Sequence, residues 1–206
     1  MTVLDERAVT RLSPASFTRL LDAGCGTGRR IRGIPRAARV PGAAVGIDLV
    51  PEMLAQGQDL RGGLAAGDLL RLPLTAEAFD LVWCRLAVGH VAGLSRFYGE
   101  LARVLTPTGT LLVTDVHPEA AGAGHRRTFR TRDGALHEVI HHVHTIAAHH
   151  AAAGHHGLVV EEAIELGVGE EIRRFYEEAG DLARYERDLG RPMLLALRLR
   201  PIIGAR

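Results

Sequence analysis

The stretch that decides the fold is LLDAGCGTG, residues 20–28. Its apolar part ends in Asp22, and glycines then stand at alternate positions, Gly24, Gly26 and Gly28. This order is typical of a buried parallel strand that turns toward a helix at the carboxyl edge of a sheet. Because glycine lacks a side chain, such a turn lets a ligand approach the backbone closely. The stretch therefore predicts a strand, a turn and a ligand at that turn.

On both sides of this stretch, short apolar runs alternate with amphipathic segments. This rhythm indicates an α/β fold, in which βα units build a parallel sheet with helices on both faces. Strands are expected at residues 19–23, 44–48, 64–67, 79–84, 110–115, 158–166 and 192–200. Helices are expected at residues 51–60, 95–105, 146–153 and 170–189.

The segment 117–144 breaks this rhythm. It holds a proline, two glycines, an arginine-rich stretch and then the alternating run LHEVIHHVH, residues 136–144, which predicts an added strand or hairpin. A chain of 206 residues is long enough for one substantial core. We therefore expect one domain, 1–206, with a substrate-cap insertion at 117–144.

Charge and composition exclude several classes of protein. The net charge is +1, from 25 basic and 24 acidic residues spread along the chain, so no basic footprint for nucleic acid is present. The apolar runs are too short to span a membrane. Two cysteines and the absence of a signal-peptide pattern favour a reduced, cytoplasmic protein. A small-molecule or protein partner fits better.

Two aspartates follow later strands in the way that nucleoside sites require. Asp48 closes a strand 24 residues after Gly24 and is suited to accept hydrogen bonds from both hydroxyls of a ribose. Asp68 ends the next strand and could hold an adenine amino group. A dinucleotide fingerprint would need glycine or alanine where Arg29 stands, which weakens but does not remove that alternative. Either aspartate could instead cap a helix.

Together with FDLVWC at 79–84 and LARVLTPTGTLLVTD at 101–115, these motifs resemble the class I S-adenosylmethionine (SAM) dependent methyltransferases. The resemblance implies a Rossmann-like, doubly wound sheet of about seven strands, mostly parallel, with an antiparallel C-terminal strand. The sequence departs from the family's pattern in two ways, so the resemblance does not define the substrate lid. TPTG at 106–109 replaces the family's Pro-Gly-Gly turn, and only about twenty residues precede the first strand, where many relatives have capping helices.

By this resemblance the glycine loop wraps the methionine part of SAM, Asp48 binds the ribose, and Asp68 with the Leu69 backbone recognises adenine. Arg85, with the residue after it, lines the sulfonium side. The resemblance assigns these positions to the cofactor: Asp22, Gly24, Cys25, Gly26, Gly28, Asp48, Leu49, Asp68, Leu69 and Arg85.

Histidines are concentrated late in the chain, with eight of the 11 between His137 and His156. No cysteine or carboxylate pattern accompanies them, so no metal ligand is assigned. His117 and His90 follow expected strands and should lie near the ligand edge, and His144 lies at the end of the insertion. These three are candidate general bases, although His117 could shape a turn before Pro118 and His90 could pack at a helix start.

The sequence thus predicts transfer of a methyl group from SAM to an oxygen, nitrogen or carbon atom of a small-molecule acceptor, such as a natural product or other secondary metabolite. S-adenosylhomocysteine would be the second product. Two alternatives stay open: a SAM-binding protein that catalyses a non-methyl reaction, and a non-catalytic partner subunit that keeps the fold. A homodimer is also compatible with an open pocket.

Overall fold

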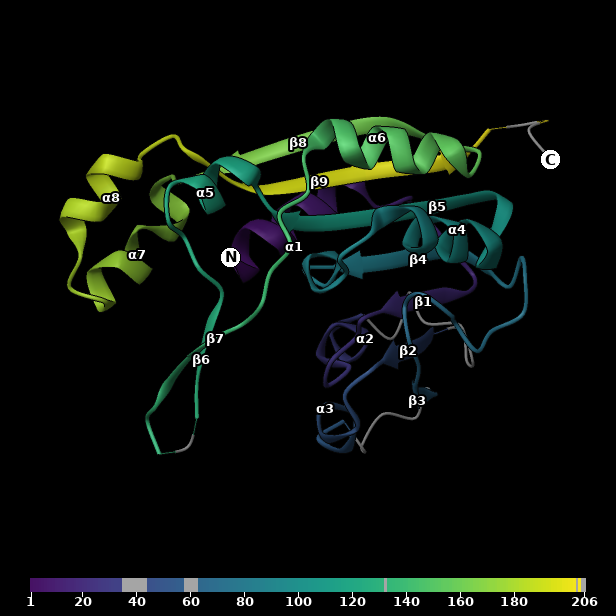
Figure 1. Ribbon diagram of the computed structural model, residues 1–206, viewed down its shortest axis with the longest axis horizontal. Coiled ribbons are helices and arrows are strands. Elements are labelled where there is room, and N and C mark those ends of the chain that lie inside the picture. Colours follow the sequence, from purple (N-terminus) through teal and green to yellow (C-terminus); the bar gives the residue numbers. More distant parts are fainter. Residues whose placement is uncertain (35–43, 58–62, 132, 203, 205–206) are drawn as a thin grey trace.

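A computed structural model describes residues 1–206 except 35–43, 58–62, 132, 203 and 205–206 (Figure 1). Seven strands form the main sheet in the order β3-β2-β1-β4-β5-β9-β8. Their bounds are β1 Leu20–Ala23, β2 Ala44–Asp48, β3 Leu64–Ala66, β4 Phe79–Arg85, β5 Leu105–Val116, β8 Leu158–Gly167 and β9 Pro192–Pro201. Neighbours from β3 to β5 pair in parallel, whereas β9 is antiparallel to both β5 and β8. The predicted doubly wound sheet is confirmed, with β9 lying inside the sheet.

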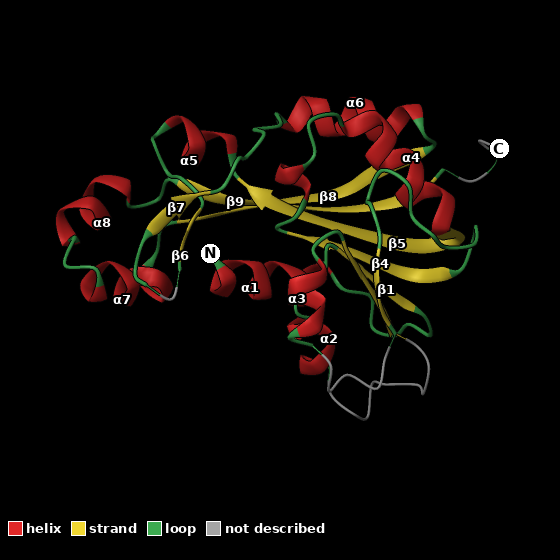
Figure 2. Ribbon diagram, turned by 60° about the horizontal axis from the view of Figure 1, so that its bottom comes forward, coloured by secondary structure: helices red, strands yellow, loops and turns green. Residues whose placement is uncertain are grey.

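Helices cover both faces of the sheet. α4 (Leu94–Val104) and α6 (Ile146–His155) lie on one face, and α1 (Thr2–Leu12) lies on the other (Figure 2). Successive side chains of a buried strand point to opposite faces. Accordingly Leu21 packs in the core beneath α4 and α6, and Leu20 packs in the core beneath α1. Both faces of the central strands are therefore buried.

The strand order reverses at β1. The chain passes from β1 through α2 (Arg29–Gly33) to β2, and α3 (Pro51–Ala55) follows β2 on the way to β3. It then returns to the other side of β1 as β4. In open α/β sheets the carboxyl edge at such a reversal forms a crevice where ligands bind. The topology therefore places the expected ligand turn between β1 and β4.

The helix α1 was not anticipated from the sequence. Its residues Leu4, Ala8 and Leu12 recur at helical spacing and are buried against the sheet. Asp5 stands beside this stripe and is also fully buried. The amino-terminal residues therefore do supply a helix on the sheet, and it carries a buried acid.

The charged helix expected at 170–189 is wrong as one helix. The structure has α7 (Glu170–Glu178) and α8 (Leu182–Asp188) instead. Gly180 adopts a left-handed φ of 68°, and the side chain of Asp181 accepts a hydrogen bond from the backbone N of Arg184. A left-handed glycine ends one helix and an aspartate caps the next. The helices expected at 95–105 and 146–153 correspond to α4 and α6. The helix expected at 51–60 is too long: α3 ends at Ala55, Gln56 is its C-cap, and residues 58–60 lie outside the described residues.

The segment 117–144 holds α5 (Pro118–Gly122) and a separate hairpin of β6 (Thr128–Arg130) and β7 (Leu136–Glu138). An added hairpin is thus confirmed, but a strand over all of 136–144 is wrong. Beyond β7 the chain packs on the short helix η2 (Val88–His90), where His142 N donates to Gly89 O at 2.7 Å. These backbone contacts replace strand pairing.

Candidate cofactor and acceptor site

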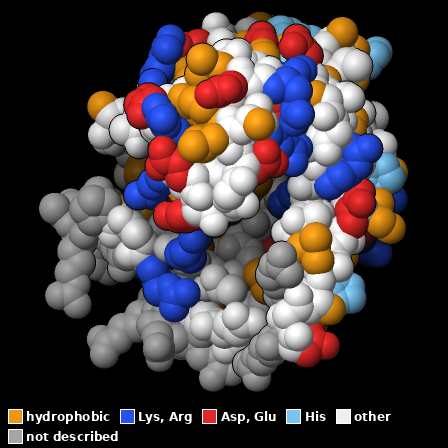
Figure 3. Space-filling model, turned by 90° about the vertical axis from the view of Figure 1, so that its left-hand side faces the viewer, with side chains coloured by type: hydrophobic (Ala, Val, Ile, Leu, Met, Phe, Trp, Pro, Cys, Tyr) orange, Lys and Arg blue, Asp and Glu red, His pale blue; other side chains and the backbone are white. Residues whose placement is uncertain are grey.

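A cavity of about 930 Å³ lies at the carboxyl edge of the parallel strands. Its walls come from the glycine loop, from the ends of β2, β3 and β4, and from η2. Arg127 and Val139 of the segment 117–144 complete it. Figure 3 views the molecule from this side and shows arginine and acidic side chains intermixed. All the cofactor positions assigned from sequence line this cavity except Asp22 and Gly28, which are not part of its surface.

The three glycines of the predicted turn have a left-handed backbone. The φ angles are 81° at Gly24, 56° at Gly26 and 67° at Gly28. A Cβ atom on Gly24 would lie 2.5 Å from the Cβ of Ala87. The loop is tied to the next strand because Gly24 N donates to Ile47 O at 2.8 Å. Residues with side chains would be strained at these φ angles, so the glycines are required by the turn.

Asp22 is a buried carboxylate beside this loop, and neither of its oxygens has a hydrogen-bond partner among the residues that the structure describes. Burial raises its pKa to about 6, a shift that the nearby guanidinium groups of Arg30 and Arg85 oppose. A buried, unpaired carboxylate is costly. It is also the group that the ammonium of an amino acid would neutralise, so this edge fits the methionine end of SAM.

Asp48 and Asp68 hold the turns that follow β2 and β3. Asp48 accepts hydrogen bonds from Gly26 N at 2.7 Å and from Val50 N at 2.9 Å, and Asp68 accepts one from Leu70 N at 2.8 Å. Both aspartates line the cavity and keep free acceptor capacity for hydroxyl or amino donors. The capping alternative therefore coexists with ligand binding, as carboxylate oxygens accept more than one hydrogen bond.

Apolar side chains lie beside Asp48 at the mouth of the cavity. Leu49, Val50 and Met53 are respectively 67%, 44% and 38% exposed, and all three line the cavity. Exposed apolar side chains grouped around polar acceptors are typical of a ligand site. A flat aromatic base such as adenine could cover them. Val50 and Met53 were not singled out from the sequence.

The end of β4 carries backbone strain. Leu86 has a φ of 57°, and its N donates to Thr114 O at 2.9 Å. A leucine in the left-handed region is held only where surrounding contacts impose it, and such residues concentrate at functional sites. Arg85 just before it lines the cavity, but its guanidinium donates to Asp5 Oδ2 on α1 at 2.7 Å. Its charge is thus turned toward α1.

The three candidate bases lie in different surroundings. His90 lines the cavity, and burial lowers its pKa, which keeps the ring neutral. His117 lies outside the cavity lining; its Nδ1 accepts from Glu119 N at 3.2 Å and so caps α5, while its Nε2 is 3.1 Å from Glu165 Oε2. His144 Nε2 is 2.8 Å from Val91 O. The geometry brings only His90 of the three to the cavity wall.

A pair missed by sequence reasoning lies nearby. Asp115, at the end of β5, has its Oδ1 3.7 Å from Nε2 of His141, and Asp115 is almost fully buried. Burial raises the pKa of Asp115 to about 7 and lowers that of His141 to about 4. His141 lines a second cavity of about 450 Å³, which shares Arg127 and Val139 with the first. The position of Asp115 at a strand's carboxyl end was the available signal; nothing local marked His141 among its neighbours.

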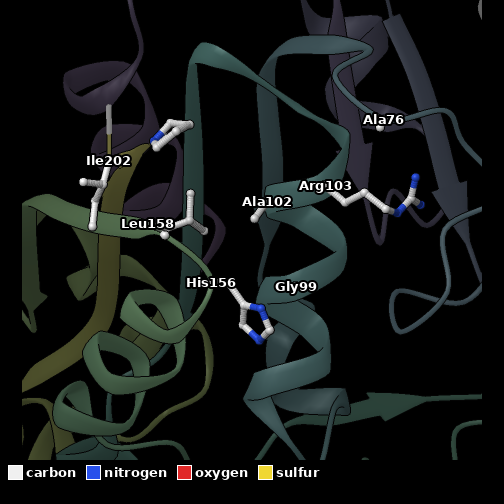
Figure 4. Close-up of a pocket in the computed structure, with 9 residues that line it drawn as sticks. Ala76, Gly99, Ala102, Arg103, His156, Leu158 and Ile202 are labelled. Atoms are coloured by element: carbon white, nitrogen blue, oxygen red, sulfur yellow. The ribbon is translucent and has the colours of Figure 1, made fainter. Parts of the chain in front are cut away.

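A smaller hollow of about 330 Å³ lies at the opposite edge of the sheet (Figure 4). Ala76 precedes β4, Leu158 begins β8, and Pro201 ends the antiparallel β9. These positions mark the amino ends of the parallel strands, away from the glycine loop. Arg103 in this hollow is already bonded to Glu100 and to two carbonyl oxygens. We assign no ligand to it.

Within the described part of the chain, no group of three or more His, Cys, Asp or Glu side chains is arranged to hold a metal ion. None of the helices found there is long and apolar enough to cross a membrane.

Comparison with known proteins matches residues 21–113 to the model of a methyltransferase domain family. A SAM-dependent methyltransferase structure from Mesorhizobium loti superposes with a TM-score of 0.73 at 21% identity, covering 94% of this chain and 96% of that one. Residues 21–113 thus match a methyltransferase domain family, and the fold is that of a SAM-dependent methyltransferase structure. The matched residues begin in β1 and end in β5, so they include the turns that carry the glycine loop, Asp48 and Asp68.

Curated proteins similar to this chain include the malonyl-[acyl-carrier protein] O-methyltransferase of Enterobacter lignolyticus. It is 39% identical over 109 residues, which are 52% of this chain and 42% of the relative. The structure of the [4+2]-cyclase SpnF has a TM-score of 0.69 at 21% identity, covering 98% of this chain and 81% of that one. The chain spans about half the length of the curated relatives it matches.

Proposed function

We propose that this protein transfers the methyl group of SAM to an oxygen, nitrogen or carbon atom of a small-molecule acceptor. The observation that carries the proposal is the unpaired carboxylate of Asp22 beside a loop of three left-handed glycines. Asp48 and Asp68 line the cavity that this loop also lines, and they keep free acceptor capacity, whereas Asp22 lies outside the cavity's surface. Asp22 would pair with the cationic amino-acid end of SAM, Asp48 with its ribose and Asp68 with its adenine.

The protein's own contribution to the reaction is chiefly placement. When bound, SAM supplies a methyl group on a positively charged sulfur, which leaves as a neutral thioether. A reactive donor of this kind needs an acceptor atom held at about 3 to 3.5 Å and protected from water. We assign the acceptor to the wall formed by His90, Arg127 and Val139, with the segment 117–144 as its cap.

Two neutral imidazoles stand at this wall or next to it. The lowered pKa values of His90 and His141 leave both rings unprotonated at neutral pH. An acceptor that carries an O–H or N–H could give its proton to such a ring, a contribution of roughly 10² to 10⁴ in rate. Asp115, 3.7 Å from His141, would stabilise the resulting imidazolium. The roles first considered for His117 and His144 stay predictions, and their contacts favour them less.

The charge of the wall favours an acidic acceptor. Arg127 lines both cavities, and its Nη1 is buried without a hydrogen-bond partner among the described residues. Burial lowers the pKa of this guanidinium, an effect that Asp115 opposes. A carboxylate would satisfy the free donor in a bidentate pair. The acceptor named for the Enterobacter lignolyticus relative is a malonyl group, which ends in a carboxylate, so malonyl thioesters are the first acceptors to test.

Calorimetric titration of the purified protein with SAM, with S-adenosylhomocysteine and with NADH tests the cofactor. Micromolar binding of the first two, without binding of NADH, is the expected result. Binding of NADH alone would replace the proposal with a dehydrogenase, and no binding at all would favour a non-catalytic partner subunit. Once an acceptor turns over, mass spectrometry should show a gain of one methyl group; a product of unchanged methyl content would indicate a non-methyl reaction.

Asp48→Asn tests the assignment of the ribose within the same titration. An amide cannot accept from two hydroxyls and two backbone N–H groups as a carboxylate does, so affinity for S-adenosylhomocysteine should fall by about tenfold or more. Glu52→Gln is the matched control, because Glu52 is an exposed acid on the adjoining α3 and does not line the cavity. Equal affinities of the two variants would contradict the assignment.

A further inference from the structure

The helix α1 holds an acid at the centre of a buried charged cluster. Asp5 accepts hydrogen bonds from Arg85 Nη2 at 2.7 Å, from Arg85 Nε at 3.1 Å and from Thr114 Oγ1 at 2.6 Å. Arg30 Nη2 lies 3.6 Å from the same carboxylate. Asp5 thus receives two hydrogen bonds from one guanidinium and lies close to another, although the rest of its helix face is apolar.

Arg85 is held from three sides. Besides Asp5, its Nη2 lies 2.8 Å from Glu6 Oε1, and its Cζ lies 5.1 Å from the ring centre of Trp83. Its side chain is only 2% exposed. A guanidinium in this setting has little freedom to turn toward another partner while Asp5 is charged.

Asp22 belongs to the same face of the sheet and yet stays unpaired. In the parallel pair of β1 and β4, Asp22 is opposite Trp83, two residues before Arg85. Side chains two residues apart on a strand share a face, so Arg85 and Asp22 lie on the face that α1 covers. The positive charges of Arg30 and Arg85 already act on the Asp22 carboxylate, but neither group donates a hydrogen bond to it.

We propose that Asp5 is a positioning residue for cofactor binding, which holds the Arg85 guanidinium on α1 and so leaves Asp22 free for the ammonium of the cofactor. Without the Asp5 charge, Arg85 could bond to Asp22, which is the one acid among the described residues whose buried oxygens lack a hydrogen-bond partner. A guanidinium bonded there would take the place of the ammonium and repel it. The inference rests on the proposed function, because it requires that the cofactor's amino group pairs with Asp22.

The test is calorimetric titration of Asp5→Asn with three nucleosides. S-adenosylhomocysteine and its decarboxylated form both carry the ammonium, whereas 5′-methylthioadenosine lacks the amino-acid part. We expect the affinity of Asp5→Asn for the two ammonium ligands to fall by about tenfold or more, which is the size of a charge-assisted hydrogen bond. Its affinity for 5′-methylthioadenosine should equal that of the parent protein. Equal weakening of all three ligands would mean a merely structural role and would overturn the proposal.

A second variant removes the competing guanidinium. In Asp5→Asn/Arg85→Met, Asp22 has lost that competitor, so affinity for S-adenosylhomocysteine should recover most of the way toward that of the parent. Glu52→Gln is the control, because Glu52 is an exposed acid on α3 and is not one of the groups that hold Arg85. If the double variant binds 5′-methylthioadenosine normally but its affinity for S-adenosylhomocysteine does not recover, the inference is also contradicted. Failure of the parent protein to bind S-adenosylhomocysteine would instead contradict the proposed function.

Discussion

At the scale of single residues, the cofactor edge is defined by side chains that the fold leaves unsatisfied. Asp22 is fully buried without a hydrogen-bond partner among the described residues, and Leu86 is held at a φ of 57°. Each costs free energy in the free protein: burying an unpaired charge disfavours the ionised form, and left-handed backbone strains a leucine. A ligand that pairs with Asp22 recovers part of this cost on binding.

The raised pKa of Asp22 predicts a pH dependence of cofactor binding. In the free protein the pKa is about 6, because burial outweighs the attraction of Arg30 and Arg85, while Asp5 and Asp48 add to the rise. Pairing with an ammonium favours the charged carboxylate, so affinity is complete above about pH 7 and is lost as the pH falls through 6. The dissociation constant of S-adenosylhomocysteine should rise about tenfold per pH unit below that point.

Titrations between pH 5 and 8 measure this dependence. 5′-Methylthioadenosine is the control ligand, because without an ammonium it gains nothing from ionised Asp22 and its affinity should stay level. If both ligands weaken in parallel, the proton is bound elsewhere and Asp22 does not pair with the amino group.

At the scale of elements, the break between α7 and α8 depends on one backbone conformation. Gly180 is left-handed, and an added Cβ there would meet no atom within 4 Å, so only the backbone disfavours a side chain. Gly180→Ala should therefore lower the free energy of unfolding by about 1 to 2 kcal/mol. Gly154, inside α6, is equally open but helical, so Gly154→Ala should raise that free energy by about 0.5 to 1 kcal/mol. Urea denaturation compares the pair; changes of the same sign would refute the conformational argument.

The elements also show what local pattern can reveal. β1, β4 and β5 each contain a short, mostly apolar run that is buried, and the sequence predicts them because burial on both faces of the sheet demands such runs. α1 was not predicted because the charged run Asp5, Glu6 and Arg7 interrupts its apolar residues and is typical of a solvent-exposed segment. The burial of Asp5 depends on its ion pair with Arg85, 80 residues further along the chain. The break at Gly180 was overlooked because charged residues with helical propensity stand on both sides.

At the scale of the whole molecule, some residues of the site can also be predicted from local sequence, and others depend on long-range contacts. Asp48 and Asp68 follow directly from strand ends, where local sequence and position coincide. His141 and Arg127 come from the segment 117–144, where the path of the chain is set by contacts such as His142 N to Gly89 O and by no local periodicity. Most of the positions predicted for the cofactor line the first cavity, whereas His90 is the one residue of the proposed acceptor wall that the sequence singled out.

Cofactor binding should stabilise the whole fold. The cavity joins turns after β1, β2, β3 and β4 with the segment 117–144, so a ligand there binds the native state and not the unfolded chain. At a concentration 100 times its dissociation constant, a ligand adds about 2.7 kcal/mol, which corresponds to a rise of about 5 to 10 °C in Tm for a chain of this size. Differential scanning fluorimetry with S-adenosylhomocysteine should show this rise, and NADH at equal concentration should not. No rise at this concentration would mean that the ligand does not bind the native state in preference to the unfolded chain.

Apart from His90, the residues of the two cavity walls are encoded by separate, consecutive stretches of the gene. The part shared with the methyltransferase domain family ends at residue 113, and the segment that supplies Arg127 and Val139 begins after β5 and returns to the sheet through α6. A single recombination event, with one crossover on each side of this segment, could exchange the acceptor wall while every cofactor contact is inherited unchanged. Under the proposed function, a new acceptor could thus be acquired in one evolutionary step without loss of the donor.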